Sequence, residues 1–382
     1  MKRSTKSSAV LTMAASLVLS FTTLATAQND ATRNLYVSAA NVPTNIAGVN
    51  TFATPPEGFN ALVATDEELA TYGLPLRPDK QLDAQHYASW ERAMAAAKIR
   101  WNGELKPIPS SRRGVMQVNR SSSQQLEAQL TGPKNVSTFN WSGVALTNTL
   151  KKWNAKTSIY DIYSVFSVPT SQLPFGSPAQ CTTPYWTELS WVGLDGYNPF
   201  LVDNGALQGG MESVIECGVP TPVYYAYIGW GNLNTVFRVN GGDVMYVEVS
   251  NSLGGLNPGY VFVEDLSTLT YNAYSVPNDG IPLVGNSAQW VVERLCCGNT
   301  GYPYPLLNTI SIFFDGGAAL NLSGRVFYPG SNASSTVIMT MVDDGDTQGI
   351  EVVNRGSVGY EGEHGLWFQD VGCAFAGGCV GY

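Results

Sequence analysis

The chain has 382 residues, of which 44% are hydrophobic and 13% are charged, and its formal net charge is −9 at pH 7. The acidic excess lies in residues 136–382, where seven Lys or Arg stand against twenty Asp or Glu. This balance excludes nucleic acid as an expected partner, because nucleic acids are bound through basic patches. The same composition fits either a protein that stays folded in acid, where protonated carboxyls no longer repel one another, or an ordinary soluble acidic surface.

The first 27 residues have the pattern of an export signal. Three basic residues precede an apolar run over residues 9–24, and Ala-Thr-Ala at 25–27 provides a small-residue cleavage site. The run is too short and too rich in Ser and Thr for a membrane span, and no later segment is long, apolar and uncharged. The sequence therefore predicts a signal peptide over residues 1–27, secretion to the extracellular space or the periplasm, and no membrane partner.

Residues 28–135 differ in composition from the rest of the chain. An Ala-rich stretch over about residues 83–101 predicts an amphipathic helix, because its apolar residues recur at near-helical spacing. These residues are Tyr87, Trp90, Met94, Ala97 and Trp101. A polar, Ser-rich stretch with the dibasic pair Arg112-Arg113 follows, which is typical of a linker that is open to cleavage. We predict a propeptide over residues 28–135; the alternative is a small permanent N-terminal domain.

Residues 136–382 have the sequence pattern of an all-β fold. Short strand-like runs recur between Asn, Gly, Asp and Pro residues. They cover residues 158–168, 186–194, 223–228, 244–250, 260–265, 289–295, 309–314 and 335–342, and a further strand begins near residue 206. Residues 245–250 alternate in polarity, which predicts an antiparallel strand with one solvent-exposed face. The pattern predicts one large antiparallel β-sandwich over residues 136–382.

Six cysteines lie in the last two-thirds of the chain. They are Cys181, Cys217, Cys296, Cys297, Cys373 and Cys379. Export permits disulfides, but six cysteines allow 15 pairings, so Cys181 with Cys217 and Cys373 with Cys379 are hypotheses only. A zinc site is not expected, because the chain has only two histidines, His86 and His364.

Residues 136–382 lack the patterns of several common catalytic sites. They contain one histidine and no nucleophile elbow, phosphate-binding glycine loop or calcium loop. Carboxyl and amide side chains remain. Glu293 shares one strand face with Gln289 and Val291. If this face lines an apolar groove, the pKa of Glu293 would rise above about 4.3. If the face lies on the surface, this pKa would stay near its ordinary value. Gln208 precedes two glycines, which permit close approach of a ligand, and its amide both donates and accepts hydrogen bonds.

A set of short motifs occurs in a characteristic order. The motifs are Asn-Trp-Ser-Gly at 140–143, Val-Pro-Thr at 168–170, Trp-Val-Gly-Leu-Asp-Gly at 191–196, Leu-Gln-Gly-Gly at 207–210, Gly-Asp at 242–243 and Ala-Gln-Trp-Val-Val-Glu at 288–293. In order and rough spacing, across about residues 139–315, the chain resembles the glutamic peptidases of the eqolisin (G1) family. Arg-Pro-Asp at 77–79 and Tyr-Ala-Ser-Trp-Glu-Arg-Ala-Met at 87–94 also resemble the leader of bacterial-type members.

The resemblance implies a concanavalin-like sandwich of two large curved sheets, with a substrate groove across one concave face. It implies catalysis by Gln208 and Glu293 without a metal or other cofactor. The residues that it places in substrate binding are Trp141, Trp191, Asp195, Glu212, Tyr225 and Tyr227. Glu212 stands where the family usually has aspartate, and Ala226 stands where it usually has a central glutamate, which leaves the pH optimum open.

The sequence thus predicts a secreted acid endopeptidase made as a zymogen. Its expected partners are polypeptide substrates and its own propeptide as an inhibitor, and we expect a monomer. One alternative is a carbohydrate-binding, lectin-like sandwich without proteolytic activity, in which Trp141, Trp191 and Trp230 are stacking platforms. Another is a glycosidase that uses Glu188 and Glu293.

Overall fold

The computed structural model describes most of the chain in segments. These are residues 36, 39–108, 134–147, 158–173, 185–197, 205–219, 221–251, 257–278, 280, 282–295, 306–309, 311–321, 323–329, 335–345, 349–358 and 366–370. The expected signal peptide, most of the expected linker, His364 and five of the six cysteines lie outside the described residues. Cys217 is disulfide-bonded; the two pairings stay predictions.

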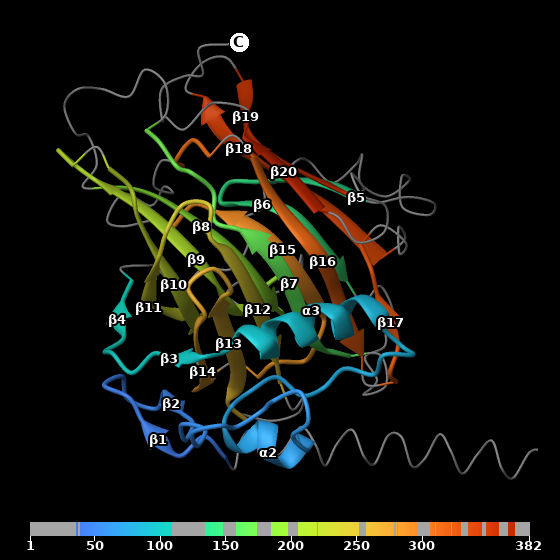
Figure 1. Ribbon diagram of the computed structural model, residues 1–382. Coiled ribbons are helices and arrows are strands. Elements are labelled where there is room, and N and C mark those ends of the chain that lie inside the picture. The colour runs from blue at the N-terminus through green and yellow to red at the C-terminus, as the bar shows by residue number, and fades with distance from the viewer. Residues whose placement is uncertain are drawn as a thin grey trace, which may run out of the picture.

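The first of two β-sheets carries the predicted catalytic residues Gln208 and Glu293. In spatial order its strands are β5 (Lys134–Thr138), β18 (Thr336–Gly345), β6 (Trp141–Thr147), β15 (Ser287–Glu293), β8 (Tyr185–Leu194), β9 (Leu207–Glu216), β10 (Val223–Trp230), β11 (Asn232–Val239) and β4 (Lys106–Pro107). Neighbours are antiparallel except β5 and β18. The edge strand β4 comes from the N-terminal region, so this region is part of the sheet (Figure 1).

The second sheet packs against the first. In spatial order its strands are β17 (Val326–Phe327), β16 (Ser311–Asn321), β7 (Ile159–Ser167), β12 (Val244–Ser250), β13 (Gly259–Asp265) and β14 (Thr270–Val276). Short strands β2 (Asn50–Thr51) and β3 (Ile99–Arg100) add beside β14, and β1 (Val42–Pro43) pairs with β2. Strands β19 (Gly349–Val358) and β20 (Leu366–Asp370) connect β18 to β16 and so join the two sheets.

The hydrophobic core lies between the two sheets. Val144 and Trp290 enter it from the first sheet, and Phe166 and Val247 enter it from the second. This arrangement follows from strand alternation, because successive side chains point to opposite faces. The all-β sandwich that the sequence predicts is confirmed, and each predicted strand run overlaps an observed strand.

The expected helix over residues 83–101 is shorter than predicted. Helix α3 covers Ala84–Ala96, and Asp83 caps its N-terminus by accepting a hydrogen bond from the backbone N–H of His86 (2.9 Å). The chain leaves the helix after Ala97 because the backbone N–H of Ile99 donates to the carbonyl of Leu269 (2.9 Å), which starts β3. A second helix, α2 (Asp66–Thr71), was not predicted; Thr65 and Glu68 form a capping box at its start.

The N-terminal region covers the outer face of the second sheet, and α3 lies across its strands (Figure 1). Trp90 and Met94 of α3 join a second apolar cluster with Tyr246 and Phe262 of the sheet. The alternating strand at residues 245–250 therefore has no solvent-exposed face: its outward side chains lie beneath the helix. Local alternation could not predict this cover, because the helix is distant in sequence: His86 and Tyr246 are 160 positions apart.

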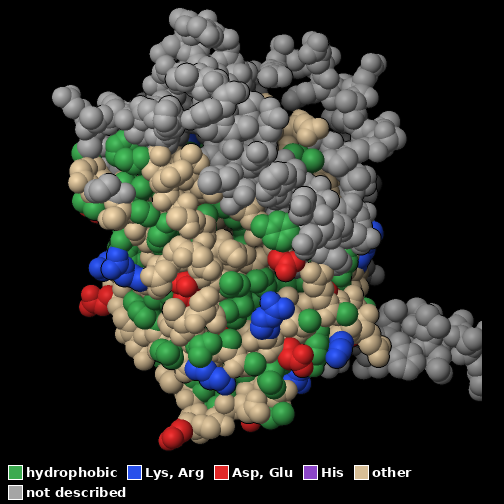
Figure 2. All heavy atoms as spheres, turned by 45° about the horizontal axis from the view of Figure 1, so that its top comes forward, with side chains coloured by type: hydrophobic (Ala, Val, Ile, Leu, Met, Phe, Trp, Pro, Cys, Tyr) green, Lys and Arg blue, Asp and Glu red, His purple; other side chains and the backbone are tan. Residues whose placement is uncertain are grey.

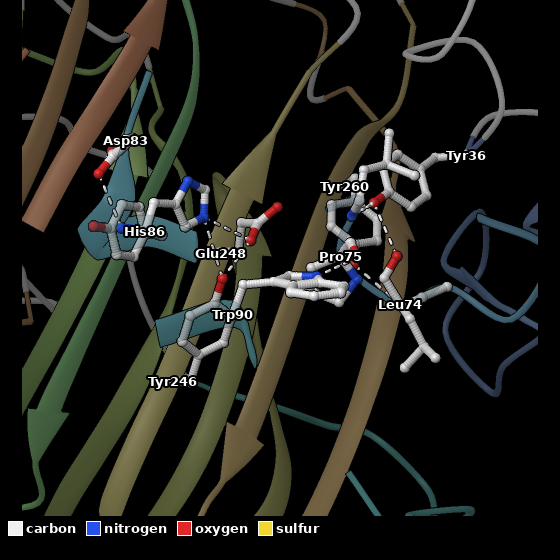
Figure 3. Close-up of polar contacts among 12 residues, drawn as sticks. Tyr36, Leu74, Pro75, Asp83, His86, Trp90, Tyr246, Glu248 and Tyr260 are labelled. Atoms are coloured by element: carbon white, nitrogen blue, oxygen red, sulfur yellow. Dashed lines mark hydrogen bonds and ion pairs between the residues drawn. The ribbon is translucent and has the colours of Figure 1, made fainter. Parts of the chain in front are cut away.

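A polar contact lies within this apolar interface. His86 of α3 points at Glu248 of β12 (Nε2 to Oε2, 3.4 Å), and the hydroxyl of Tyr246 donates to the same carboxylate oxygen (2.6 Å; Figure 3). The imidazole also stacks on Tyr163 at 3.7 Å between ring centroids. Buried polar groups need such partners, so the contact fixes where α3 sits on the sheet.

On the face seen in Figure 2, charged side chains are scattered among polar and apolar ones. Among the described residues, no helix is long and apolar enough to span a membrane.

Candidate active site

Four neighbouring strands bring the predicted catalytic residues to one face of the first sheet. In the β-sheet register, Gln208 of β9 lies opposite Gly193 of β8 and Gly229 of β10. Glu293 of β15 lies opposite Leu189 of β8, which in turn lies opposite Glu212. Residues paired across antiparallel strands point to the same face. Gln208 and Glu293 therefore share the outer face of this sheet, with β8 between their strands.

Glu293 is held by tryptophan. The indole Nε1–H of Trp191 donates to Glu293 Oε2 at 2.8 Å. Trp141, the cross-strand neighbour of Glu293, packs edge-to-face against Trp191 with ring centroids 4.9 Å apart. Burial raises the pKa of Glu293 to about 8, although interaction with Trp141 and Trp191 opposes the rise. Trp141 also lowers the pKa of Glu293, although its Nε1–H forms no hydrogen bond within the usual limits of distance and angle.

Gln208 is held by tyrosine. The Tyr227 hydroxyl donates to Gln208 Oε1 at 2.7 Å, and both side chains are buried. Burial raises the pKa of Tyr227 well above its ordinary value, and the nearby carboxyls of Glu293 and Glu212 raise it further. The phenol therefore keeps its proton and donates it in this hydrogen bond. The amide NH₂ is the end of Gln208 that is left to act as a donor.

Trp191 and Tyr227, which donate to Glu293 and Gln208, lie on either side of Gly210. Trp191 lies opposite Gly210 on β9, and Gly210 lies opposite Tyr227 on β10. Gln208 and Glu212 precede and follow Gly210 by two residues on the same face. Trp191 donates to Glu293 and Tyr227 donates to Gln208, so the two hydrogen bonds lie on neighbouring strands on the two sides of Gly210. An amide and a carboxyl thus flank the same stretch of sheet.

Gly193 is a site residue that the sequence reasoning missed. A Cβ atom at this position would lie 3.0 Å from Trp191 Cζ3 and 3.1 Å from Gln208 Cβ. The nearest atom is the backbone oxygen of Leu207, at 2.6 Å, so a side chain there would clash with β9 and would also crowd Trp191 and Gln208. The motif Trp-Val-Gly-Leu-Asp-Gly indicates that Gly193 lies beside Trp191, because strand alternation places these two residues on one face. By contrast, Gly209 and Gly210 make room for core Val261 and for the backbone of β8.

Glu212 and Tyr225 extend the same face. They lie opposite each other on β9 and β10. Burial raises the pKa of Glu212 to about 7. Tyr225 is half-buried, and the guanidinium of Arg238 lies 5.7 Å from the centre of its ring. Ala226, in contrast, points into the sandwich core. The residue that meets Gln208 from this strand is therefore Tyr227.

Asp195 stabilises the backbone that leads into β15. Its Oδ2 accepts from the N–H groups of Val284 (2.6 Å) and Gly285 (3.1 Å), and its Oδ1 accepts from Asn286 (2.6 Å) and Ser287 (3.4 Å). Burial raises its pKa, and these four hydrogen bonds oppose the rise. The structure thus gives Asp195 a role in positioning β15, and its contact with substrate stays a prediction.

The geometry disfavours both the sugar-binding and the glycosidase alternatives. Trp141, Trp191 and Trp230 are 1%, 0% and 2% exposed, so none is a surface platform for sugar stacking. Glu188 lies one residue from Leu189 on β8, and Leu189 is the partner of Glu293. Alternation therefore puts Glu188 and Glu293 on opposite faces of the sheet, which separates the two carboxyls that a glycosidase would need.

The buried carboxyls predict a fold that is more stable in acid than at neutral pH. Unfolded, Glu293 and Glu212 would release their protons near pH 4.5, whereas in the folded chain they hold them to about pH 8 and about pH 7. Between these values the folded state binds more protons, so the stabilisation that these two groups contribute is fully present below pH 4.5 and is lost as pH rises toward their folded pKa values. We expect the free energy of unfolding to fall by about 1.4 kcal/mol per pH unit for each group.

Denaturant unfolding between pH 4 and pH 7 measures this slope. The double variant Glu212→Gln, Glu293→Gln is expected to show a shallower pH dependence than the wild type. Equal slopes in the two proteins would contradict the account.

Comparison with solved structures gives glutamic peptidases at low sequence identity. The chain is similar to scytalido-glutamic peptidase in complex with a transition state analog inhibitor, with 16% identity and a TM-score of 0.46, over 61% of this chain and 98% of that one. It is also similar to aspergilloglutamic peptidase from Aspergillus niger, with 22% identity and a TM-score of 0.39, over 49% of this chain and 99% of that one.

No curated protein matches the chain. No group of three or more His, Cys, Asp or Glu side chains that could hold a metal ion occurs among the described residues. Residues 139–357, more than half of the chain, match the family described as the Peptidase A4 family, which confirms the resemblance to the eqolisins. The chain therefore belongs to the Peptidase A4 family and is a peptide-bond hydrolase.

Proposed function

We propose that this protein is an exported acid endopeptidase in which Gln208 and Glu293 act together on one water molecule. The observation that carries the proposal is the pair of buried hydrogen bonds from Trp191 to Glu293 and from Tyr227 to Gln208. Together they present a carboxyl and an amide on one face, on either side of Gly210.

The reaction needs a base, an oxyanion donor and an acid. Glu293 as carboxylate accepts a proton from the water, whose oxygen bonds to the scissile carbonyl carbon. The carbonyl oxygen becomes negative and accepts a hydrogen bond from Gln208 Nε2. Glu293 then donates its proton to the leaving nitrogen, and the carbon–nitrogen bond breaks. Tyr227 keeps the amide of Gln208 in the orientation that these reaction steps require.

The raised pKa of Glu293 fits the proposal that the described form is latent. With a pKa of about 8, the carboxyl is protonated in acid and cannot accept a proton from water. Burial is the largest cause of the rise, and interaction with Trp191 and Trp141 opposes it. Entry of water and substrate into the groove therefore lowers the pKa, because the cost of desolvation falls while the tryptophans still stabilise the carboxylate.

The N-terminal region supports synthesis as a zymogen with its own segment as inhibitor. Ile108 belongs to the same apolar cluster as Trp141, Trp191 and Tyr227, so the chain reaches the face that carries the site. The region also packs on the second sheet through α3. Cleavage of the linker therefore leaves a bound fragment unless acid or substrate displaces it.

Incubation of the exported protein at pH 3–5 with a denatured protein substrate tests this function. We expect self-cleavage within residues 105–140, followed by digestion of the substrate. Gel filtration after cleavage separates a released propeptide, which elutes alone, from a permanent N-terminal domain, which coelutes. Absence of proteolysis in acid together with glycan binding at neutral pH would favour the lectin-like alternative instead.

A further inference from the structure

The edge strand β11 is covered by a short piece of the N-terminal region. In this antiparallel pair, Pro107 lies opposite Asn234 and Lys106 lies opposite Thr235. The Ile108 N–H donates to the carbonyl of Leu233 (2.9 Å), and the Thr235 hydroxyl donates to the carbonyl of Lys106 (3.3 Å). The contact has the form of strand addition, in which an extended peptide completes an open sheet edge.

The side chain of Ile108 provides the apolar anchor of this contact. Lys106 and Pro107 are exposed, whereas Ile108 is 6% exposed and belongs to the apolar cluster on the face of the site. Leu233 belongs to the same cluster. Main-chain bonds to β11 are independent of side-chain identity, so the apolar anchor is the part of this contact that selects sequence.

The anchor lies in line with Gln208. Leu233 pairs with Gly229, and Gly229 pairs with Gln208, so these residues form one row across the sheet. Leu233 Cδ2 lies 2.6 Å from where a Cβ of Gly229 would be, so its side chain covers the glycine beside Gln208. Ile108 extends this row by one strand. At about 4.8 Å per strand, the anchor lies roughly 14 Å from the backbone of Gln208.

We propose that the β11 edge, with the apolar anchor site at Leu233, is a substrate-docking site for extended polypeptides that carry an aliphatic residue. Lys106–Ile108 occupies this site in the described form, and a substrate strand replaces it. This inference rests on the proposed function. A substrate strand paired with β11 has to turn from this edge across the sheet face to reach Gln208. Since an extended chain advances about 3.3 Å per residue, the aliphatic residue would lie at least about four positions from the scissile bond.

Cleavage-site mapping tests the proposal with the full-length protein. The chain is incubated in acid with a peptide library made from denatured proteins, and the cleaved bonds are identified by mass spectrometry. In the wild type we expect Ile, Leu or Val to be enriched on one side of the cleaved bond, at a position at least about four residues away from it. Burial of one such side chain corresponds to about a ten- to hundredfold preference.

Three variants separate docking from fold stability. Leu233→Ser is expected to abolish the distant enrichment and to leave the preference at the residues that flank the bond unchanged, and the volume-conserving Leu233→Met is expected to retain both. Ile108→Ser weakens only the intramolecular occupant, so it is expected to speed cleavage by the full chain with the same site preference.

Three outcomes would overturn the proposal. They are a wild type without distant enrichment, a Leu233→Ser protein that keeps it, and a folded Ile108→Ser protein that cleaves no faster than the wild type. If the wild type cleaves no peptide at all, the proposed function itself fails, and the docking site fails with it.

Discussion

Replacement of Glu293 by Gln is expected to lower kcat/KM by at least about a thousandfold. In the proposed reaction Glu293 both accepts and donates a proton, and positioned acid–base groups contribute about 10²–10⁴-fold each. Gln has nearly the same shape, and its amide oxygen can still accept the hydrogen bond from Trp191 Nε1. The variant therefore removes proton transfer and leaves the geometry in place. Steady-state kinetics in acid with a protein substrate measure the loss.

Glu264→Gln is the matched control for this variant. Glu264 is a buried glutamate on β13 of the second sheet, and burial raises its pKa well above the ordinary value. The control thus makes the same chemical change in a similarly buried setting, away from the face of the site. We expect near wild-type kcat/KM for Glu264→Gln. If both variants retain activity, Glu293 is not the acid–base residue.

Replacement of Gln208 by Ala is expected to lower kcat by about 10²–10³-fold. Loss of one oxyanion donor raises the barrier by about 2.7–4 kcal/mol. Because the oxyanion exists only at and near the transition state, the effect falls on kcat more than on KM. The substitution also leaves the Tyr227 hydroxyl without its partner, so a thermal melt of the variant accompanies the kinetics.

Gln289→Ala is the matched control for the amide. Gln289 is buried on the same face as Glu293, and it lies opposite Gly193, which separates it from Gln208. Its amide nitrogen donates to the Ser287 hydroxyl. We expect a kcat close to that of the wild type for this variant. A Gln208→Ala protein that is impaired no more than Gln289→Ala would contradict the oxyanion role.

The sequence predicts the sandwich and the face of β15 that carries Glu293, because both follow from local alternation; the pairing of Gln208 with Glu293 came from the family resemblance. On β15, Val291 and Glu293 point to one face, and Trp290 points to the core. The same rule applied to β10 places Ala226 in the core and Tyr227 at the site. The motif pattern alone had assigned the family's glutamate position to Ala226.

What the sequence could not show are contacts between distant segments. The hydrogen bond from Tyr227 to Gln208 depends on the register of β9 and β10, which only the folded sheet fixes. Asp195 stabilises backbone about 90 residues away through four N–H groups, which no motif encodes. The addition of β4 to β11 likewise joins Lys106 to Thr235, so a helix in the N-terminal region was predictable, whereas the pairing of that region with the first sheet was not.

A double-mutant cycle on Gln208 and Glu293 tests most directly whether the two side chains act on the same water. The measurement is kcat/KM in acid for the wild type, Gln208→Ala, Glu293→Gln and the protein that carries both changes. Groups that act as a unit are strongly non-additive, so the double variant is expected to be no more than about fivefold slower than Glu293→Gln alone. A double variant that loses the full product of the two single effects would show independent roles and would contradict the pair.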